Sequence, residues 1–228
     1  MFRSVLQSAG LHGLERRLKK SLGLHKNYMS HPPYGADIHR LVKAHIDIVR
    51  YGTIALALHR LNEEKVPGAM AELGVFKGEL STYLAAIERH RTLHLFDTFS
   101  GFPDSDLEAG ETNDARFRDT SEDAVRRRIG DCTNVRFHVG PFPDTAAPVM
   151  DERFAFVMLD PDKYRPTLAG LEIFYPRLSP GGYLFMHDYN SPESNFAVSR
   201  AAREFMRDKP ERLVDLPDAK GSVLFRKL

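Results

Sequence analysis

The sequence predicts an α/β fold built on a seven-stranded, mostly parallel sheet whose last strand is antiparallel. Two observations predict it. First, short apolar runs alternate with helical segments from Pro67 onward, a pattern typical of a parallel sheet with helices on both faces. Second, the last two runs are joined only by residues 217–221. Because this connection is too short for a crossover helix, the two strands must be antiparallel.

The expected elements follow one another along the second part of the chain. The expected strands are Ala69–Leu73, Thr92–Phe96, Val135–Val139, Phe154–Leu159, Tyr183–His187, Arg212–Leu216 and Ser222–Arg226. The expected helices are Glu79–Arg89, Ser121–Ile129, Arg165–Leu178 and Glu193–Asp208. Residues 101–120 are rich in Asp and Glu and show no helical or strand pattern. A loop of this length beside a ligand crevice is typical of a lid, so we expect a lid here.

The chain is expected to divide into an N-terminal helical segment, residues 1–66, and a ligand-binding domain, residues 67–228. A helix is expected over about residues 37–62 from its apolar stripe. Residues 1–30 carry six Lys and Arg against one Glu, with apolar side chains near helical spacing. This pattern predicts an amphipathic helix that packs on its own fold or across a homodimer. The alternative is a helix that lies on a membrane surface.

Composition narrows the class of protein. The net charge of +1 provides no global field that would attract nucleic acid. The single cysteine, Cys132, has no internal disulfide partner, which fits a reducing compartment. No apolar run approaches the roughly 20 residues that a membrane-spanning helix needs. We therefore expect a cytoplasmic protein with no membrane span and no nucleic-acid partner.

A strand that runs into a glycine turn and then a helix marks the expected cofactor end. Gly74 and Gly78 permit a tight turn and a close approach of the backbone to a ligand. Glu72 ends the strand and Glu79 lies in the first helical turn, where both would repel the phosphates of NAD or ATP. The two carboxylates suit a cofactor that carries an ammonium and a sulfonium, and they disfavour a nicotinamide dehydrogenase.

Two further residues extend this end. Asp97 closes the next strand, 23 residues after Gly74, where an acid accepts hydrogen bonds from ribose hydroxyls. Its alternative role is that of a turn former. Gly140, at the end of the third strand, would let the adenine end of the cofactor approach the backbone, with a plain turn as the alternative.

Acidic residues follow two neighbouring strands. Asp160 and Asp162 come directly after the fourth strand, and His187 and Asp188 end the fifth. Because neighbouring parallel strands bring their carboxyl ends together, we expect Asp160 and Asp188 to converge. With no evident arginine partner, these carboxylates would repel each other unless a cation offsets them. Oxygen ligands predict Mg²⁺, with Mn²⁺ or Ca²⁺ as alternatives, and turn residues are the structural alternative.

Taken together, these stretches resemble the macrocin O-methyltransferase (TylF-like) family over about residues 48–226. The motifs that carry the resemblance are Arg50-Tyr51-Gly52, Pro67–Gly74, Phe96–Pro103, Leu159–Tyr164, Tyr175–Gly182 and His187-Asp188-Tyr189. The resemblance implies a Rossmann-like class I methyltransferase fold that binds S-adenosyl-L-methionine in residues 67–228. It also implies Mg²⁺ and, as the acceptor, the hydroxyl of a sugar or of a natural-product-like small molecule.

The resemblance also implies roles for individual residues. It places Glu72, Gly74 and Asp97 at the cofactor and Asp160 and Asp188 at the metal. It makes Asp162 a candidate base.

Two departures from the family pattern keep alternatives open. His187 stands where relatives often have Asp. Because imidazole is a poor Mg²⁺ ligand, this departure leaves the identity of the metal open. His187 is either a third metal ligand or a partner of the ligands. Lys163 follows Asp160 at the Asp-x-x-Lys spacing of the catechol O-methyltransferases, so it competes with Asp162 as the base. One alternative is a metal-independent methyltransferase with His187 as the base. The other is a non-catalytic partner subunit that binds the cofactor.

Overall fold

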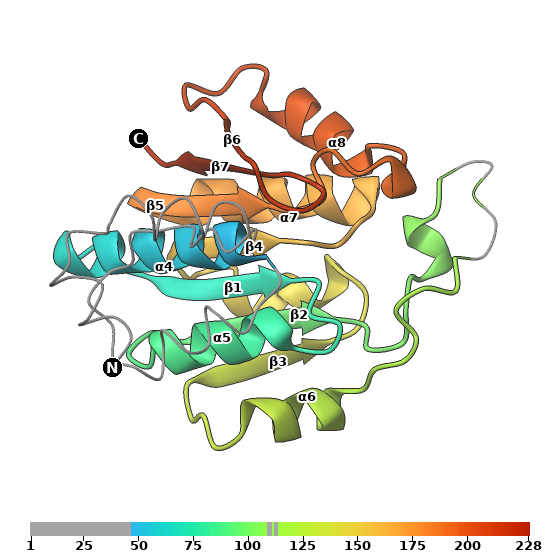
Figure 1. The fold of residues 1–228 in the computed structure, drawn as a ribbon, viewed down its shortest axis with the longest axis horizontal. Helices are drawn as coiled ribbons and strands as arrows, with labels where there is room; N and C mark the ends of the chain where they lie inside the picture. Colours follow the sequence, from blue (N-terminus) through green and yellow to red (C-terminus); the bar gives the residue numbers. More distant parts are fainter. Residues whose placement is uncertain (1–46, 109–110, 112–113) are drawn as a thin grey trace, which may run out of the picture. The chain divides into compact units, whose positions relative to one another are not determined.

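The computed structural model describes residues 47–108, 111 and 114–228, all of which belong to one compact unit (Figure 1). The amphipathic helix and the homodimer contact expected within residues 1–46 lie outside the described residues and stay predictions.

A seven-stranded sheet forms the centre of the described part, as predicted. Its strands are β1 (Ala69–Leu73), β2 (Leu93–Asp97), β3 (Val135–Val139), β4 (Phe154–Leu159), β5 (Leu178–Met186), β6 (Val214–Leu216) and β7 (Ser222–Arg226). They lie side by side in the order β3-β2-β1-β4-β5-β7-β6. Strands β1 to β5 are parallel, and β7 is antiparallel to both β5 and β6. Every residue of β1 and β4 is buried, which explains why both strands are apolar except at Glu72.

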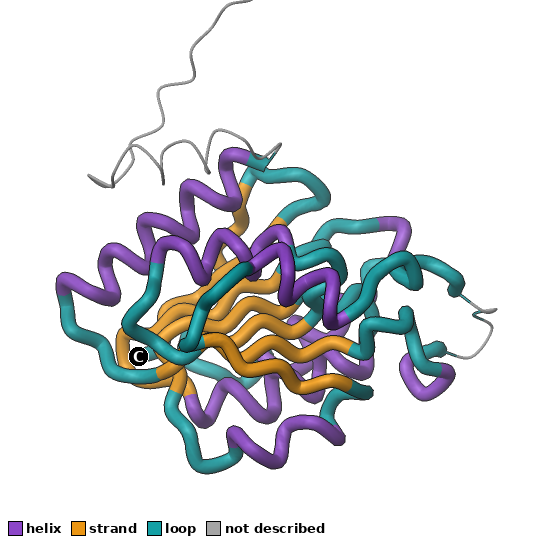
Figure 2. The backbone as a smooth tube through the Cα atoms, turned by 90° about the horizontal axis from the view of Figure 1, so that it is seen from below, coloured by secondary structure: helices purple, strands orange, loops and turns teal. Residues whose placement is uncertain are grey.

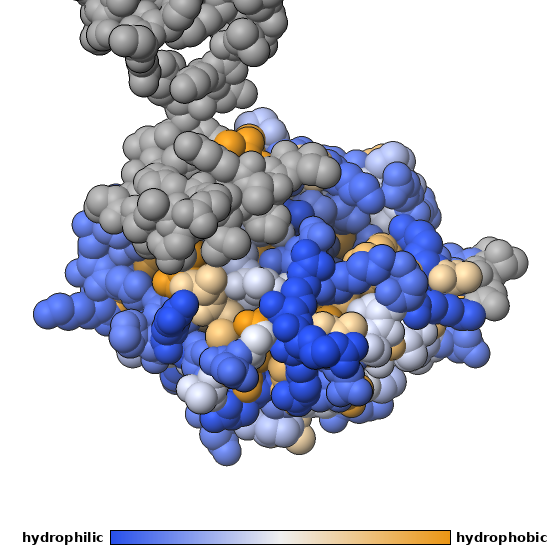
Figure 3. Space-filling model, turned by 60° about the horizontal axis from the view of Figure 1, so that its bottom comes forward, coloured by the Kyte–Doolittle hydropathy of each residue, from blue (hydrophilic) through white to orange (hydrophobic). Residues whose placement is uncertain are grey.

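Helices cover both faces of this sheet (Figure 2). On one face pack α4 (Ile48–Glu63), α5 (Glu79–Ile87) and α6 (Glu122–Ile129), and on the other α7 (Tyr164–Phe174) and α8 (Ala197–Met206). Short 3₁₀ helices lie in the connections: η1 (Asp104–Asp106), η2 (Asp144–Val149), η3 (Tyr175–Arg177) and η4 (Pro192–Ser194). On the face drawn in Figure 3, hydrophilic residues predominate and hydrophobic ones show only in small patches. None of the helices described is both long enough and apolar enough to span a bilayer.

Three predicted boundaries were wrong by four residues or more. The helix expected to reach Leu178 ends at Phe174, and β5 begins at Leu178 instead of Tyr183. The Pro-Gly-Gly sequence indicates a loop, but β5 pairs with β4 at Leu178 and again from Tyr183, so the register shift between these positions includes the sequence in the strand as a bulge. The helix expected from Glu193 begins only at Ala197, because the two preceding residues have left-handed backbone angles that no α-helix contains.

Helix α4 packs on the sheet and shares one hydrophobic core with it. Ile54, Leu58 and Leu61 are at most 1% exposed and lie in one hydrophobic cluster with Met70 and Phe156 of the strands. The segment boundary expected at residue 66 therefore falls between α4 and the sheet on which α4 packs. This packing brings the first turn of α4 to the edge of the sheet where the acidic residues lie.

Glu211 fastens the end of the chain to the sheet domain. Its carboxylate is 4% exposed and accepts hydrogen bonds from the Tyr175 hydroxyl at 2.7 Å, the Lys227 ammonium at 2.6 Å and the Leu228 amide at 3.2 Å. Burial by itself would raise the pKa of Glu211. The hydrogen bonds from Lys227 and Tyr175 outweigh burial and lower that pKa to about 2.

We expect Glu211→Gln to lower the free energy of unfolding at pH 7 by roughly 2–3 kcal/mol, because each pKa unit corresponds to about 1.4 kcal/mol. The pKa is depressed in the folded state, so this contribution is complete above the unfolded value of about 4.3 and is lost as the pH falls toward 2. Urea unfolding should therefore show a smaller difference from wild type at pH 3 than at pH 7. Glu204→Gln, which removes an exposed carboxylate bonded to the Tyr164 hydroxyl, is the control. An equal difference at both pH values would contradict the assignment.

Candidate active site

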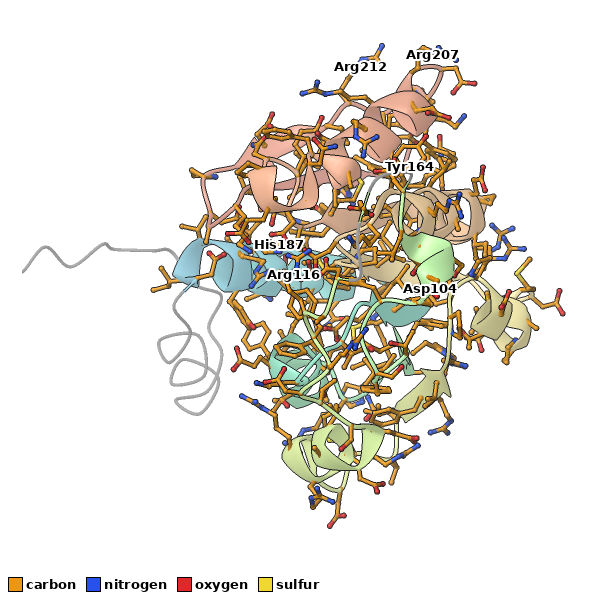
Figure 4. All side chains as sticks on the ribbon, turned by 90° about the vertical axis from the view of Figure 1, so that its right-hand side faces the viewer. Asp104, Arg116, Tyr164, His187, Arg207 and Arg212 are labelled. Atoms are coloured by element: carbon orange, nitrogen blue, oxygen red, sulfur yellow. The ribbon has the colours of Figure 1, made fainter. Side chains whose placement is uncertain are left out.

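A cavity of about 950 Å³ opens at the carboxyl edge of strands β1 to β5. The cavity contains residues of both the expected cofactor end and the expected acceptor end. The predicted residues that line it are Glu72, Gly74, Asp97, Gly140, Asp160, Asp162, His187 and Asp188. Gly78 and Lys163 are not among the described residues that line it. Figure 4 looks onto this edge, with His187 near the centre of the view. The cofactor and acceptor residues predicted from separate motifs thus share one cavity.

The two glycines after β1 are required by the backbone. Gly74 has a φ of +90°, and a Cβ built on it would lie 2.1 Å from the carbonyl oxygen of Asp160. Gly78 has a φ of +72°, and its Cβ would meet the side chain of Val125 in α6 at 2.6 Å. Gly74 therefore allows the ends of β1 and β4 to touch, whereas Gly78 allows α6 to pack on the turn.

Asp97 holds the glycine turn in place. Its Oδ2 accepts the backbone N–H groups of Val75 and Phe76 at 2.7 and 2.8 Å, and its Oδ1 accepts that of Phe99 at 2.6 Å. A carboxylate offers about four acceptor positions, so roughly one remains for a ligand hydroxyl. The turn-former role and the cofactor role considered for Asp97 are therefore compatible.

We expect Asp97→Asn to lower the free energy of unfolding by about 2 kcal/mol without any ligand present. The new amide has a single acceptor oxygen, so it leaves unpaired either the N–H of Phe99 or those of Val75 and Phe76. Urea unfolding measures the change, and Asp215→Asn in the exposed strand β6 is the matched control. A variant as stable as the control would show that the turn does not depend on this carboxylate.

Glu72 lies in the wall of the cavity and is only 2% exposed. Burial raises its pKa, a hydrogen bond from the Ser81 hydroxyl at 2.6 Å lowers it, and the charges of Asp160 and Asp97 raise it, with a result of about 8. Glu72 forms no ion pair with a residue that the structure describes. Such a carboxyl stabilises a cation that enters the cavity.

Asp160, His187 and Asp188 form a tight cluster at the acceptor end. His187 Nδ1 lies 3.0 Å from Asp160 Oδ1 and 3.1 Å from Asp188 Oδ1, while its Nε2 lies 3.1 Å from the Ala219 carbonyl oxygen. Because a carbonyl only accepts, Nε2 carries a hydrogen in this arrangement. Burial lowers the pKa of His187. The charge and the hydrogen bond of Asp160 raise this pKa by more than burial lowers it, so the net shift is upward.

The spacing of the cluster would allow its residues to share a metal ion. One ligand atom each of Asp160, His187 and Asp188 lies within 4.8 Å of the other two. Asp47 and Asp218 form a second such group with the same histidine. The sequence motifs did not indicate Asp47 or Asp218, because both lie outside the strand ends.

Cations lie beside these carboxylates, so the expectation that they lack an arginine partner was wrong. Arg50 Nη1 lies 3.6 Å from Asp160 Oδ2, and its Nε lies 3.6 Å from Asp47 Oδ2. Lys220 Nζ lies 4.0 Å from Asp188 Oδ2. Arg50 comes from the first turn of α4 and Lys220 from the β6–β7 turn. The Arg-Tyr-Gly motif was the one sequence signal that could have pointed to Arg50.

Asp162 and Asp188 are held in strained backbone conformations. Their φ angles are +59° and +56°, and the Oδ1 atom of each is buried without a hydrogen-bond partner. Burial, a hydrogen bond with Asp188 and the charges of Asp160 and Asp188 raise the pKa of Asp162 to about 9. Backbone strain and crowded carboxylates in one cavity are typical of a functional site.

Lys163 is directed away from the cavity although it is next to Asp162 in the chain. Its ammonium lies 3.0 Å from Glu111 Oε1 and 3.1 Å from Asp114 Oδ2, and its side chain is 4% exposed. Of the two candidate bases, only Asp162 lines the cavity. The sequence could not separate them, because both follow the same strand.

The chain matches the family model described as Macrocin-O-methyltransferase (TylF) over residues 16–217. The chain belongs to the macrocin O-methyltransferase family. It is therefore an S-adenosylmethionine-dependent O-methyltransferase, as the resemblance implied, and the nicotinamide dehydrogenase alternative is excluded.

Named relatives share this assignment. The methyltransferase is 30% identical over 182 residues to the mycinamicin III 3''-O-methyltransferase of Micromonospora griseorubida, covering 72% of each chain. It is 32% identical over 160 residues to the demethyldecarbamoylnovobiocin O-methyltransferase of Streptomyces niveus, covering 63% of this chain and 61% of the relative. The structure of the O-methyltransferase NovP matches with a TM-score of 0.66 and 29% identity, over 79% of this chain and 80% of NovP. The calicheamicin methyltransferase CalS11, at 18% identity and a TM-score of 0.60 over 89% and 98% of the chains, shares the fold.

Proposed function

We propose that this methyltransferase transfers a methyl group to a hydroxyl of a sugar-bearing or similar natural-product small molecule, assisted by a divalent cation. The observation that carries the proposal is the single cavity that joins Glu72 and Asp97 to the cluster of Asp160, His187 and Asp188. The names of the relatives, which act on mycinamicin III and on demethyldecarbamoylnovobiocin, support the acceptor class.

The cofactor end of the cavity fits S-adenosylmethionine, which supplies the electrophilic methyl group. Glu72 would hold its ammonium, because among the described residues this buried carboxyl forms no ion pair and Arg50 acts on it only from a longer distance. Asp97 would accept a ribose hydroxyl at its remaining acceptor position. Gly74 and Gly140, which both line the cavity, would let the ligand approach the backbone. Gly78 lies outside the lining and would act through the shape of the turn.

The acceptor end fits a divalent cation. Five carboxyl groups lie at this end: Asp47, Asp160, Asp162, Asp188 and Asp218. In the described part of the chain, Arg50 and Lys220 are the only lysine or arginine residues whose side chains lie within 4.0 Å of them. Among the described residues, Asp162 Oδ1 is buried without a hydrogen-bond partner and Asp188 Oδ1 has only the contact with His187 Nδ1, so both oxygens are open to a cation. Asp160 and Asp188 would hold Mg²⁺ or Mn²⁺, with His187 as a third ligand. A cation at this place lowers the pKa of the acceptor hydroxyl and orients it.

Asp162, ionised once a bound cation beside it lowers its raised pKa, would take the proton of the acceptor hydroxyl. It is the candidate base that lines the cavity, and it is held beside the cluster by the strained turn after β4. A second candidate is metal-independent transfer with His187 as the base. Nε2 carries the hydrogen that bonds the Ala219 carbonyl, so Nδ1, 3.0 Å from Asp160 Oδ1, is the ring nitrogen that would accept the proton.

Methyl-labelled S-adenosylmethionine with mycinamicin III or demethyldecarbamoylnovobiocin as the acceptor tests the reaction. We expect transfer of label, loss of transfer in EDTA and recovery on adding Mg²⁺ or Mn²⁺. Asp160→Asn and Asp188→Asn should lower kcat/KM about 100-fold or more while the Kd for S-adenosylhomocysteine stays within about twofold.

Asp151→Asn, an exposed change in the turn before β4, is the control and should retain wild-type kinetics. Undiminished turnover in EDTA would exclude the metal and leave His187 as the base. In that case His187→Gln should abolish the transfer.

The pH dependence of cofactor binding tests Glu72. Its pKa of about 8 means that most of the free protein carries a protonated Glu72 at pH 6.5. Because an ammonium binds the ionised form, the Kd for S-adenosylhomocysteine should fall about tenfold between pH 6.5 and pH 8. Calorimetry with Glu72→Gln should show weaker binding that no longer varies with pH. Glu79→Gln, which removes a more exposed cavity carboxylate, should keep the wild-type dependence, and a flat wild-type curve would refute the role.

A further inference from the structure

Three phenylalanine rings form an apolar wall of the cavity. Phe76, Phe102 and Phe117 all line it. The rings of Phe76 and Phe117 meet edge to face at 4.9 Å between centroids, and those of Phe102 and Phe117 at 5.4 Å. Phe76 follows the glycine turn at the cofactor end. The wall therefore starts at the cofactor turn and continues through Phe117 to Phe102.

Two cationic side chains, Lys163 and Arg116, lie over rings of this wall. Lys163 Nζ lies 4.8 Å from the ring centroid of Phe102, and the Arg116 guanidinium lies 5.5 Å from Phe102 and 5.3 Å from Phe117. Asp114 joins the two cations, since it accepts Arg116 Nη2 at 2.8 Å and lies 3.1 Å from Lys163 Nζ. A cation over an aromatic ring contributes about 0.5–2 kcal/mol, so these contacts fix the ring orientations.

Lys163 is the part of this network that is anchored to the rigid fold. It is the N-cap residue of α7, and its carbonyl oxygen accepts the Thr167 hydroxyl at 2.7 Å. Asp114, Arg116 and Phe102 all lie in the long segment after β2, whose described residues form no regular structure except η1. A buried ammonium with two carboxylate partners, Glu111 and Asp114, therefore ties that segment to the helix beside the acidic cluster.

We infer that Lys163 is a positioning residue: it fixes Asp114, and through Asp114 it fixes Arg116 and the rings of Phe102 and Phe117 as the apolar wall of the acceptor site. This inference rests on the proposed function and names a property of its substrate. The acceptor is an amphiphilic molecule whose reacting hydroxyl faces the acidic cluster and whose apolar face packs on Phe102. Lys163 touches neither the acceptor nor the cofactor and does not take the proton.

Hydrogen exchange tests the positioning without any acceptor. The amides of Asp106, Leu107 and Arg116 form hydrogen bonds inside the segment, at 3.0, 3.2 and 3.2 Å. In Lys163→Met we expect these amides to exchange about tenfold faster than in wild type, whereas Lys163→Arg should restore their protection. Unchanged exchange in Lys163→Met overturns the inference.

Lys209→Met is the matched control. Lys209 also lies 4.8 Å from a phenylalanine ring, that of Phe205, and 2.6 Å from a carboxylate, that of Asp208. It does not line the cavity in the part of the chain that the structure describes. Faster exchange at residues 106, 107 and 116 in this variant would indicate a general loss of stability and would overturn the assignment to Lys163.

Kinetics with demethyldecarbamoylnovobiocin or mycinamicin III separate a positioning residue from a base. Lys163→Met and Phe102→Ala should each raise the acceptor KM about tenfold, with kcat within about threefold and an unchanged pH profile of kcat. A base would instead show kcat reduced about 100-fold or more and an altered pH profile, which overturns the inference. So does an unchanged KM in Phe102→Ala. If wild type methylates neither compound, the proposed acceptor class fails, while the exchange experiment still decides the role of Lys163.

Discussion

The contact between the ends of β1 and β4 is the constraint on which the site depends. The Asp160 amide donates to the Leu73 carbonyl at 2.8 Å, and the space beside Gly74 is filled by the Asp160 backbone. Any side chain at Gly74 would force these two strand ends apart. Because Glu72 precedes this contact and Asp160 stands in it, the same contact sets the distance between the cofactor end and the acceptor end of one cavity.

Electrostatics organises the rest of the site around that contact. Acidic residues gather at the acceptor end, and the fold brings Arg50 and Lys220 to them from α4 and from the β6–β7 turn. These two cations neutralise part of the charge and leave an excess of carboxylates for a cationic ligand. Lys163 and Arg116 are used differently, since they pair with acids of the segment after β2 and hold aromatic rings at the cavity.

Much of this arrangement could be predicted, because it follows from local chemistry and from one rule of sheet geometry. Parallel strands end at one edge, so Asp160 and Asp188 were expected to meet, and both line the cavity with Glu72 and Asp97. The prediction was wrong at the start of β5, where the local preference of the sequence and the pairing of the strands disagree. Residues 179–182 contain Pro-Gly-Gly and were expected outside a strand, yet pairing with β4 at Leu178 and at Tyr183 includes them in β5 as a bulge.

The sequence by itself determined the fold class, the glycine turn and the acids at the strand ends, because periodicity and turn chemistry act between near neighbours in the chain. Only the tertiary structure decided which of two adjacent residues faces the ligand. Asp162 takes a left-handed backbone conformation and lines the cavity, while Lys163 turns away toward carboxylates more than forty residues earlier in the chain. Arg50 likewise reaches Asp160 only because α4 packs on the sheet. Such contacts depend on the packing of distant segments, which no local pattern contains.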